Sequence, residues 1–302
     1  MQSLWMLLAS VMFAIMGACI KLASDLQASL SQIVVFRGAP SVFLLLGWAL
    51  STRRSLRPKS WRLHMVRNIM GVSSMWMGFF AISTLPLATA VSLNYTAPLF
   101  IAGWMLARDW KQRDGMRTLA VLLGFAGVVA ILRPSIGAEQ TVGALVGLMA
   151  GASSAVAMMQ VRSLGRIGEP EWRTVLFFSC FVCLTGGVGA FVEGWPQVGL
   201  DGWLMLTAVG VTGLVGQLAM TRAFGMGSAL LTAALQYSTI IFAALLSALV
   251  WDQIPDWMAW SGMGLIVAAG LLSTWRTYHE TRVMQGSNPA AGSPAESAER
   301  RV

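Results

Sequence analysis

Residues 80–100 read FAISTLPLATAVSLNYTAPLF, and residues 222–242 read RAFGMGSALLTAALQYSTIIF. A shift of 142 positions places Asn94 over Gln236 and Tyr95 over Tyr237. Two apolar segments are not expected to share an amide, a tyrosine and a hydroxyl in this order from composition alone. The match therefore predicts an internal repeat in this chain.

Ten apolar stretches, each long enough to cross a bilayer, fill almost all of the 302 residues. A spanning helix needs roughly 20 mainly apolar residues. Charged residues make up 11% of the chain, against about 25% in soluble proteins. The stretches are apolar on every face, which favours helices over barrel strands. The expected spans are residues 3–22, 30–50, 66–84, 87–107, 116–133, 141–161, 172–192, 202–223, 228–250 and 256–275.

Most of the 21 basic residues follow the second, fourth, sixth, eighth and tenth spans. This bias predicts that those loops and both termini are cytoplasmic, in a multi-pass protein of the cell inner (plasma) membrane. The first span lacks a preceding basic region and a cleavage site, so we expect it to remain in the mature protein. The net charge of +8 is then a topology signal, and nucleic acid is not an expected partner.

Each repeat contains five spans, and an odd number places the second copy in the membrane upside down. We therefore expect an all-α integral membrane fold of ten transmembrane helices in two inverted five-helix repeats. The first repeat covers residues 1–135 and the second 136–275, followed by a disordered cytoplasmic tail at 276–302 that is rich in Ser, Ala, Pro and Gly. Inverted repeats are a common plan of secondary transporters, with the substrate site near the midplane.

Several segments carry a resemblance to a known family. They are Lys21 and Arg37 in a K…FRGAP arrangement, PLATAVSLNYTAPLF at 86–100, GFAGVVAIL at 124–132 and GLIVAAGLL at 264–272. Over residues 3–275 the chain resembles the EamA-like branch of the drug/metabolite transporter (DMT) superfamily. The resemblance implies a ten-helix carrier without ATPase activity, which alternates between inward-open and outward-open states and moves small polar or amphipathic metabolites.

The chain lacks one residue that the family usually has, a proline in the ninth helix. It has another, an acidic residue, at the corresponding position of both repeats. Ile240 stands where the ninth helix usually has a proline matching Pro98, which puts a bend of that helix in doubt. The acidic residue that usually follows the fourth and ninth helices is present as Asp109 and Asp252.

Enzyme activity, a metal site and a cofactor are not expected. The chain has no G-x-x-x-x-G-K-[ST] phosphate loop. His64 and His279 fall in cytoplasmic segments, where we expect solvated side chains. No predicted span has Asp or Glu in its interior, so neither a catalytic carboxylate pair nor a metal cluster can form there. Cys180 and Cys183 form a C-x-x-C in an apolar helix and are interpreted as packing residues.

Arg37 is the cation inside a predicted span, roughly 10 Å below the outer surface at a helical rise of 1.5 Å per residue. Its guanidinium could bind a substrate carboxylate at two points. The alternative, that Arg37 snorkels outward or binds loop carbonyls while Gly38 and Pro40 bend the helix, stays open. Lys21, at the outer boundary, is expected to be an anchor.

Other polar and aromatic side chains are predicted to line a midplane cavity with Arg37. Hydrogen bonding between packed helices is the alternative role for each of them. Pro98 interrupts the fourth helix and is the candidate hinge. The predicted substrate-binding residues are Arg37, Trp76, Asn94, Tyr95, Gln217, Gln236 and Tyr237.

One buried cation, uncharged amides and aromatic rings, without a buried anion, favour a solute that bears a carboxylate. We therefore expect an inner-membrane exporter of a small zwitterionic amino-acid-type metabolite, either an amino acid or an amino-acid-derived metal chelator. Uptake of a nucleoside-like or sulfonium metabolite such as S-adenosylmethionine is the transport alternative. A non-transporting membrane subunit or sensor is the alternative of another class, and a homodimer is left open.

The absence of buried acids also bears on coupling, because proton-coupled carriers commonly relay protons through buried Asp, Glu or His. Downhill exchange or facilitated efflux is the favoured mechanism. A proton site at a helix end, at Asp25, Asp109 or Asp252, is the alternative.

Overall fold

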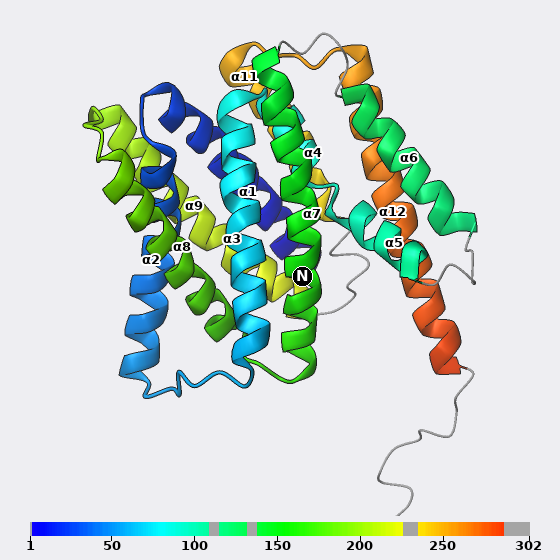
Figure 1. Cartoon of the computed structure of the whole chain (residues 1–302), viewed down its shortest axis with the longest axis horizontal. Helices are drawn as coiled ribbons and strands as arrows, with labels where there is room; N and C mark the ends of the chain where they lie inside the picture. Colours follow the sequence, from blue (N-terminus) through cyan, green and yellow to red (C-terminus); the bar gives the residue numbers. More distant parts are fainter. Residues whose placement is uncertain (1, 109–114, 132–137, 226–234, 287–302) are drawn as a thin grey trace, which may run out of the picture.

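The computed structural model describes residues 2–108, 115–131, 138–225 and 235–286, and no strand occurs in these ranges. Figure 1 shows a bundle of helices in which α5, α6 and α12 lie to one side of the others. The helices are α1 (Gln2–Asp25), α2 (Leu30–Ser51), α3 (Trp61–Thr84), α4 (Leu87–Asn94), α5 (Ala97–Arg108), α6 (Gly115–Ile131), α7 (Ala138–Arg166), α8 (Glu171–Glu193), α9 (Leu200–Gly225), α11 (Ser238–Trp251) and α12 (Trp257–Gly286).

Local sequence explains where the helices begin. Ser29 caps α2 in a reciprocal arrangement with Gln32, in which each side chain binds the backbone N–H of the other residue. The Ser60 hydroxyl accepts from the backbone of Leu63 at the start of α3. Pro86 and Pro170 directly precede α4 and α8, where the missing proline N–H leaves no helical bond unmade.

The described helices fall in all ten predicted spans, although residues 228–234 of the ninth span lie outside the described ranges. Five are long and apolar enough to cross a membrane, within α1, α2, α7, α8 and α9. Shorter apolar helices cover Leu87–Ile101, Val121–Ala130, Ser238–Trp251 and Trp257–Leu272. The remaining predicted span, residues 66–84, lies within α3, which begins at Trp61 and carries Arg67 and Asn68 near its start.

Helices of the first repeat pack along helices of the second. The pairs are α1 with α9, α3 with α7, α2 with α8, α4 with α11, and α6 with α12. In the internal repeat, α1 corresponds to α7 and α3 corresponds to α9. The contact between α1 and α9 therefore has its counterpart in the contact between α7 and α3. The other three pairs convert into themselves. This exchange is the pattern that a two-fold relation between inverted repeats requires.

Both predicted helices that contain the repeated tyrosine are interrupted at that residue. The fourth span is not one helix, because a turn at Tyr95 and Thr96 separates α4 from α5. In the ninth span, residues 235 and 236 are helical, Tyr237 is a turn, and α11 begins at Ser238. The missing proline at Ile240 therefore does not leave this helix continuous.

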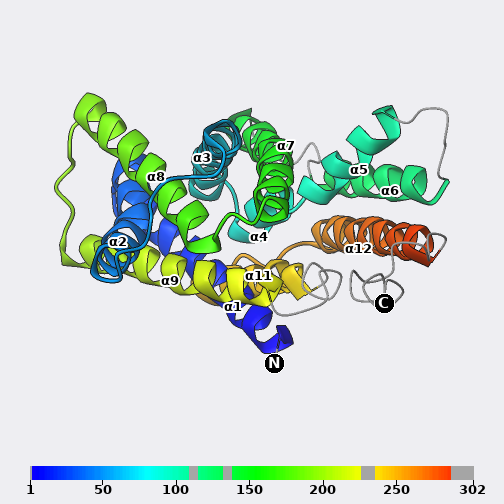
Figure 2. The ribbon, with the colours of Figure 1, turned by 90° about the horizontal axis from the view of Figure 1, so that it is seen from below.

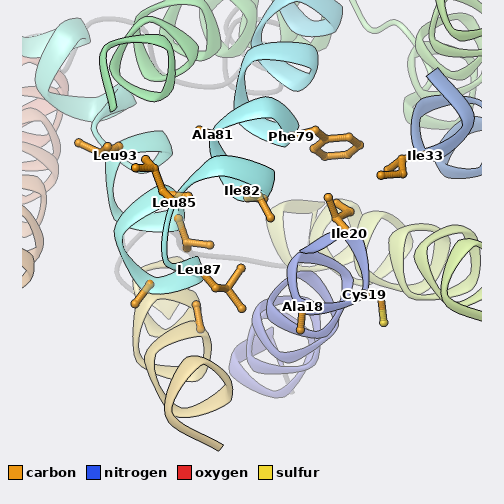
Figure 3. Close-up of a cluster of buried hydrophobic side chains, with 14 of the residues drawn as sticks. Ala18, Cys19, Ile20, Ile33, Phe79, Ala81, Ile82, Leu85, Leu87 and Leu93 are labelled. Carbon is orange, nitrogen blue, oxygen red and sulfur yellow. The ribbon is translucent and has the colours of Figure 1, made fainter. Parts of the chain in front are cut away.

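A cluster of buried apolar side chains joins α1, α2, α3 and α4 (Figure 3) and continues into the second repeat, through Leu206 of α9, Ile240 of α11 and Ile266 of α12 among others. It includes Ile20, Ile33, Phe79 and Leu87. Large apolar side chains also cover the outside of the bundle, where Phe191 is 91% exposed. In a bilayer these side chains contact lipid tails that are equally apolar. Their exposure therefore does not carry the hydrophobic penalty that it would carry in water.

Two details differ from the sequence-based expectations. The tail does not begin as a disordered segment at residue 276, because α12 continues to Gly286; residues 287–302 lie outside the described ranges. Lys21 is not an anchor at the lipid surface. It is buried, and its Nζ donates to the Leu85 carbonyl at 2.9 Å, which links α1 to the connection between α3 and α4.

Candidate functional site

Arg37 is buried between α2 and α9, with 5% of its surface exposed. Its Nη2 donates to Oε1 of Gln217 at 3.3 Å. A Cβ atom at Gly213, one helical turn before Gln217, would lie 2.7 Å from the Arg37 side chain, so the glycine leaves the room that this side chain occupies. Two of the predicted site residues, Arg37 and Gln217, are therefore in direct contact. The side chain does not snorkel to the surface.

Trp76 joins α3 to α8. The indole Nε1 donates to Oγ1 of Thr185 at 3.2 Å. A Cβ at Gly189, one turn further along α8, would lie 3.1 Å from the end of the indole ring, so Trp76 follows the surface of α8 closely. Trp76 is half-buried, as expected of a side chain at the inner surface of a bundle.

The two helix interruptions face each other across the repeats. The Tyr95 hydroxyl donates to Oγ1 of Thr239 at 3.1 Å, and the ring centroids of Tyr95 and Tyr237 are 6.3 Å apart. The Gln236 side chain also interacts with the Tyr95 hydroxyl. Tyr95, Gln236 and Tyr237 thus form one group, and Thr239 is a member that the sequence did not single out.

Asn94 ends α4 next to this group, and Gly78 of α3 lies beside its amide. Its Oδ1 is buried and has no hydrogen-bond partner among the described residues. An unsatisfied buried acceptor costs about 1–3 kcal/mol, which a donor on a bound solute would recover. Pro98 is the second residue of α5, directly after the interruption, where a proline fits the first helical turn.

The side-chain contacts thus place the predicted residues in three local groups: Arg37 with Gln217, Trp76 with Thr185, and the tyrosine pair with Gln236 and Thr239. They do not connect Arg37 or Trp76 directly to the tyrosine pair. Of the helix-end acids, Asp25 accepts from the Trp251 indole at 3.1 Å and Asp252 is an exposed left-handed cap residue of α11. Asp109 lies outside the described residues.

A buried ionic cluster beside the connection between α2 and α3 was missed by the sequence analysis. Glu169 has no exposed side-chain surface and accepts from the Lys59 backbone N–H and from Nη1 of Arg173, each at 2.9 Å. Nη2 of Arg173 donates to the Ser55 carbonyl at 2.7 Å. The cluster therefore fastens the connection between α2 and α3 to the start of α8.

His64 belongs to this cluster and is 1% exposed, so its expected place on the solvated surface is wrong. Its Nε2 lies 3.4 Å from Oε1 of Glu169. Burial lowers the pKa of His64 below its ordinary value of 6.5, although Glu169 opposes this change. Burial alone would raise the pKa of Glu169, but the bonds from Lys59 and Arg173 lower it below 4.5.

One signal for this cluster was present in the sequence. Glu169 precedes Arg173 by four residues, the spacing of a helical ion pair, although Glu169 itself lies two residues before α8 begins. No signal identified His64, because its burial depends on Phe177 of α8, whose ring centroid lies 5.0 Å from that of the imidazole. Within the part of the chain that the structure describes, no group of His, Cys, Asp and Glu could hold a metal ion.

Comparison with known proteins gives the chain its family. The sequence profile of the EamA-like transporter family matches residues 1–133 and again 141–275. The pseudopaline exporter CntI of Pseudomonas aeruginosa (strain UCBPP-PA14) is 29% identical over 265 residues, which cover 87% of this chain and 92% of the exporter. The riboflavin transporter of Vibrio cholerae is 25% identical, with 93% and 95% covered, and the S-adenosylmethionine uptake transporter of Rickettsia bellii is 23% identical, with 80% and 82% covered.

A solved crystal structure of 19% sequence identity superposes with a TM-score of 0.60 and covers 92% of this chain and 98% of its own. At this identity the superposition shows the fold alone. The relatives are named as transporters, and transport rather than enzyme catalysis is what the matched profile describes. The chain belongs to the EamA-like transporter family, in the DMT superfamily.

Proposed function

We propose that this chain is an inner-membrane carrier that exports a small zwitterionic amino-acid-type metabolite, either an amino acid or an amino-acid-derived metal chelator. The carrier works by alternating access between the two repeats, at residues 1–135 and 136–275. Both termini are cytoplasmic in this proposal. The similarity to the pseudopaline exporter supports export as the direction.

The observation that carries the proposal is the position of Arg37. Its guanidinium is buried, and its one hydrogen-bond partner in the described chain is the uncharged amide of Gln217. A buried charge without a counter-ion is unfavourable by several kcal/mol, so a carboxylate on the solute would be bound strongly there. A two-point bond between guanidinium and carboxylate would also fix the orientation of the solute.

The interrupted helices support the transport cycle. Tyr95 and Tyr237 stand at the interruptions of two helices from different repeats. Their rings pack together, and the Tyr95 hydroxyl donates to Thr239 of α11. Chain segments freed from regular helical bonding can change direction at low cost. We assign the hinge to Pro98, which follows the interruption of the fourth span, while Trp76, Asn94, Gln217 and Gln236 supply uncharged polar contacts to the solute.

Uptake of a sulfonium metabolite such as S-adenosylmethionine is the second candidate, supported by the similarity to the Rickettsia uptake transporter. The positive charge of Arg37 argues against it, because a sulfonium cation would be repelled and no predicted span holds an acid in its interior. The carboxylate of that solute would still be accepted.

Paired metabolite profiling tests the proposal. Cells that lack the chain, their parent and a complemented strain are compared for solutes inside the cells and in the spent medium. Export predicts one solute that accumulates inside the deleted strain and disappears from its medium. The reverse pattern would favour uptake, and an unchanged profile under several nutrient and metal conditions would reject transport of such a solute.

Substitution of Arg37 tests the site. In the complemented strain, Arg37→Gln should reduce export of the carboxylate-bearing solute by roughly 10- to 150-fold, because a hydrogen bond to a charged group contributes about 1.5–3 kcal/mol. Transport of the corresponding amide should change much less. Arg57→Gln, at an exposed arginine of the connection between α2 and α3, is the matched control. Equal loss for acid and amide would contradict a carboxylate contact at Arg37.

A further inference from the structure

The two helix interruptions are built alike. Tyr95 and Tyr237 have similar backbone angles, φ −80° and ψ 11° against φ −65° and ψ −17°. The residue after each tyrosine has a hydroxyl that donates to the carbonyl three residues earlier at 2.6 Å, from Thr96 in one repeat and from Ser238 in the other. The shift of 142 positions relates these contacts, so the bonds made at one interruption are expected at the other.

The symmetry fails at the tyrosine hydroxyls. The Tyr95 hydroxyl donates to Oγ1 of Thr239 at 3.1 Å, and this threonine donates in turn to the Gln236 carbonyl at 2.8 Å. The shift of 142 positions places Ala97 over Thr239, and alanine has no hydroxyl. The Tyr237 hydroxyl is buried and has no hydrogen-bond partner among the described residues. The protein therefore satisfies one tyrosine of the pair and leaves the other unsatisfied.

Tyr237 lies at the boundary between two groups of helices. Figure 2 shows α4 and α11 side by side, with α2 and α8 to one side of them and α5, α6 and α12 to the other. Tyr237 is 4% exposed and belongs to the buried apolar cluster. A Cβ at Gly270 of α12 would overlap the Tyr237 hydroxyl, so this hydroxyl faces a helix of the second group. Separation of α12 from α11 would uncover a hydroxyl that already lacks a partner.

We propose that Tyr237 is the solute-binding tyrosine of the pair, and that Tyr95, bonded to Thr239, ties the two interrupted helices together. This inference rests on the proposed function and adds to its solute a neutral hydrogen-bonding group. The group is neutral because Tyr237 packs in an apolar cluster, where a buried charge would be costly. A phenol hydroxyl both donates and accepts, so an amide or a hydroxyl of the solute would satisfy it.

Replacement of each tyrosine by phenylalanine separates the two roles. Tyr95→Phe removes a hydroxyl that is bonded to the protein, so it should lower the melting temperature of the detergent-solubilised chain. Tyr237→Phe removes a hydroxyl without a protein partner, so it should leave the melting temperature unchanged or raise it. If the melting temperature of Tyr237→Phe falls as far as that of Tyr95→Phe, the hydroxyl has a partner in the protein and the proposal is wrong.

A hydroxyl added at position 97 tests the broken symmetry directly. Ala97→Thr recreates in the first repeat the partner that Thr239 supplies in the second, and Ala97→Val adds the same bulk without a hydroxyl. Ala97→Thr should melt at a higher temperature than Ala97→Val and export less solute, because Tyr237 then bonds to the protein. Both differences should vanish when Tyr237→Phe is added to each variant. Equal melting temperatures and equal export for the two variants would overturn the proposal.

Export by Tyr237→Phe separates this inference from the proposed function. The solute is the one that the deleted strain fails to release, and its amounts inside the cells and in the medium are measured at equal membrane abundance of each variant. At a given intracellular concentration, Tyr237→Phe should lower export roughly 2- to 13-fold, the contribution of one neutral hydrogen bond. Export at the parental rate would reject the role of Tyr237 and leave the proposed function intact. If no solute depends on the chain, both fail.

Discussion

His64 is a buried imidazole close to the carboxylate of Glu169 and to two arginines, and burial lowers its pKa. Glu169 faces it at 3.4 Å, and the positive charges of Arg67 and Arg173 act against its protonation. Because its pKa is lowered in the folded protein, the unfolded chain binds a proton at His64 at a higher pH than the folded chain does. Unfolding is then favoured as the pH falls below about 6.5.

We therefore predict a pH-dependent loss of stability that His64 controls. The melting temperature of the detergent-solubilised protein should fall between pH 7.5 and pH 5, and His64→Gln should make this fall smaller. Glu169, with its lowered pKa, adds a further loss only at more acidic pH, near and below 4.5, where the unfolded carboxylate is protonated first. Tryptophan fluorescence during heating, at each pH, measures both effects.

His279 provides the control, since it is exposed on α12. His279→Gln should leave the pH dependence of the parent unchanged. A His64→Gln variant with the same pH dependence as the parent would show that this imidazole does not resist protonation.

The buried basic residues show which functional candidates can be recognised from the sequence alone and which cannot. Arg37 was identified from the sequence because it is a charge in the middle of an apolar run. Arg67 and His64 were not, because basic residues at or just before the end of a span are ordinary markers of the cytoplasmic side. Only the packing of α8, through Phe177 and Phe178, shows that both are buried.

At the level of helices, glycines decide how closely partners approach. A Cβ at Gly127 of α6 would lie 2.7 Å from the Gly262 carbonyl oxygen of α12, and a backbone atom cannot turn aside. A Cβ at Gly264, two residues further along α12, would meet nothing within 4 Å. Both glycines lie in apolar helices, and only the structure shows that their surroundings differ.

Replacement of each glycine by alanine should therefore give opposite results. Gly127→Ala should cost about 1–3 kcal/mol of stability, the usual penalty of overpacking. Gly264→Ala should be neutral or gain up to about 1 kcal/mol, because alanine is the better helix former. Thermal unfolding in detergent compares the two. Similar melting temperatures for both variants would mean that α6 and α12 can separate without loss.

The helix interruptions were partly predictable. Pro98 marked the fourth span as irregular, yet the turn itself lies at Tyr95 and Thr96, ahead of the proline. In the ninth span Ile240 suggested a continuous helix, and the turn at Tyr237 contradicts that reading. The repeated Asn/Gln–Tyr pair was the better indicator, because it follows the fold symmetry and not the propensity of one residue.

On the scale of the whole molecule, the charge bias makes a prediction about orientation. The connection between α2 and α3 should face the cytoplasm, and the connection between α8 and α9 should face the other side. In a variant without the three native cysteines, Gln197→Cys should react with a membrane-impermeant maleimide in intact cells. Ser55→Cys should react only after the membrane is permeabilised. Both positions are exposed in the structure. Labelling of Ser55→Cys in intact cells would reverse the proposed topology.

The exchange of partners between the repeats also constrains how the chain is made. Arg37 has its amide partner at Gln217, and the Ser74 hydroxyl donates to the carbonyl of Ala150, so polar groups of early helices are satisfied by late ones. While the ribosome is still translating the second half, these polar groups lie in the bilayer without their hydrogen-bond partners. Until α7 and α9 are inserted, the Arg37 guanidinium has no protein partner in the membrane. The insertion machinery, or water at the surface of the bilayer, must solvate it during that time.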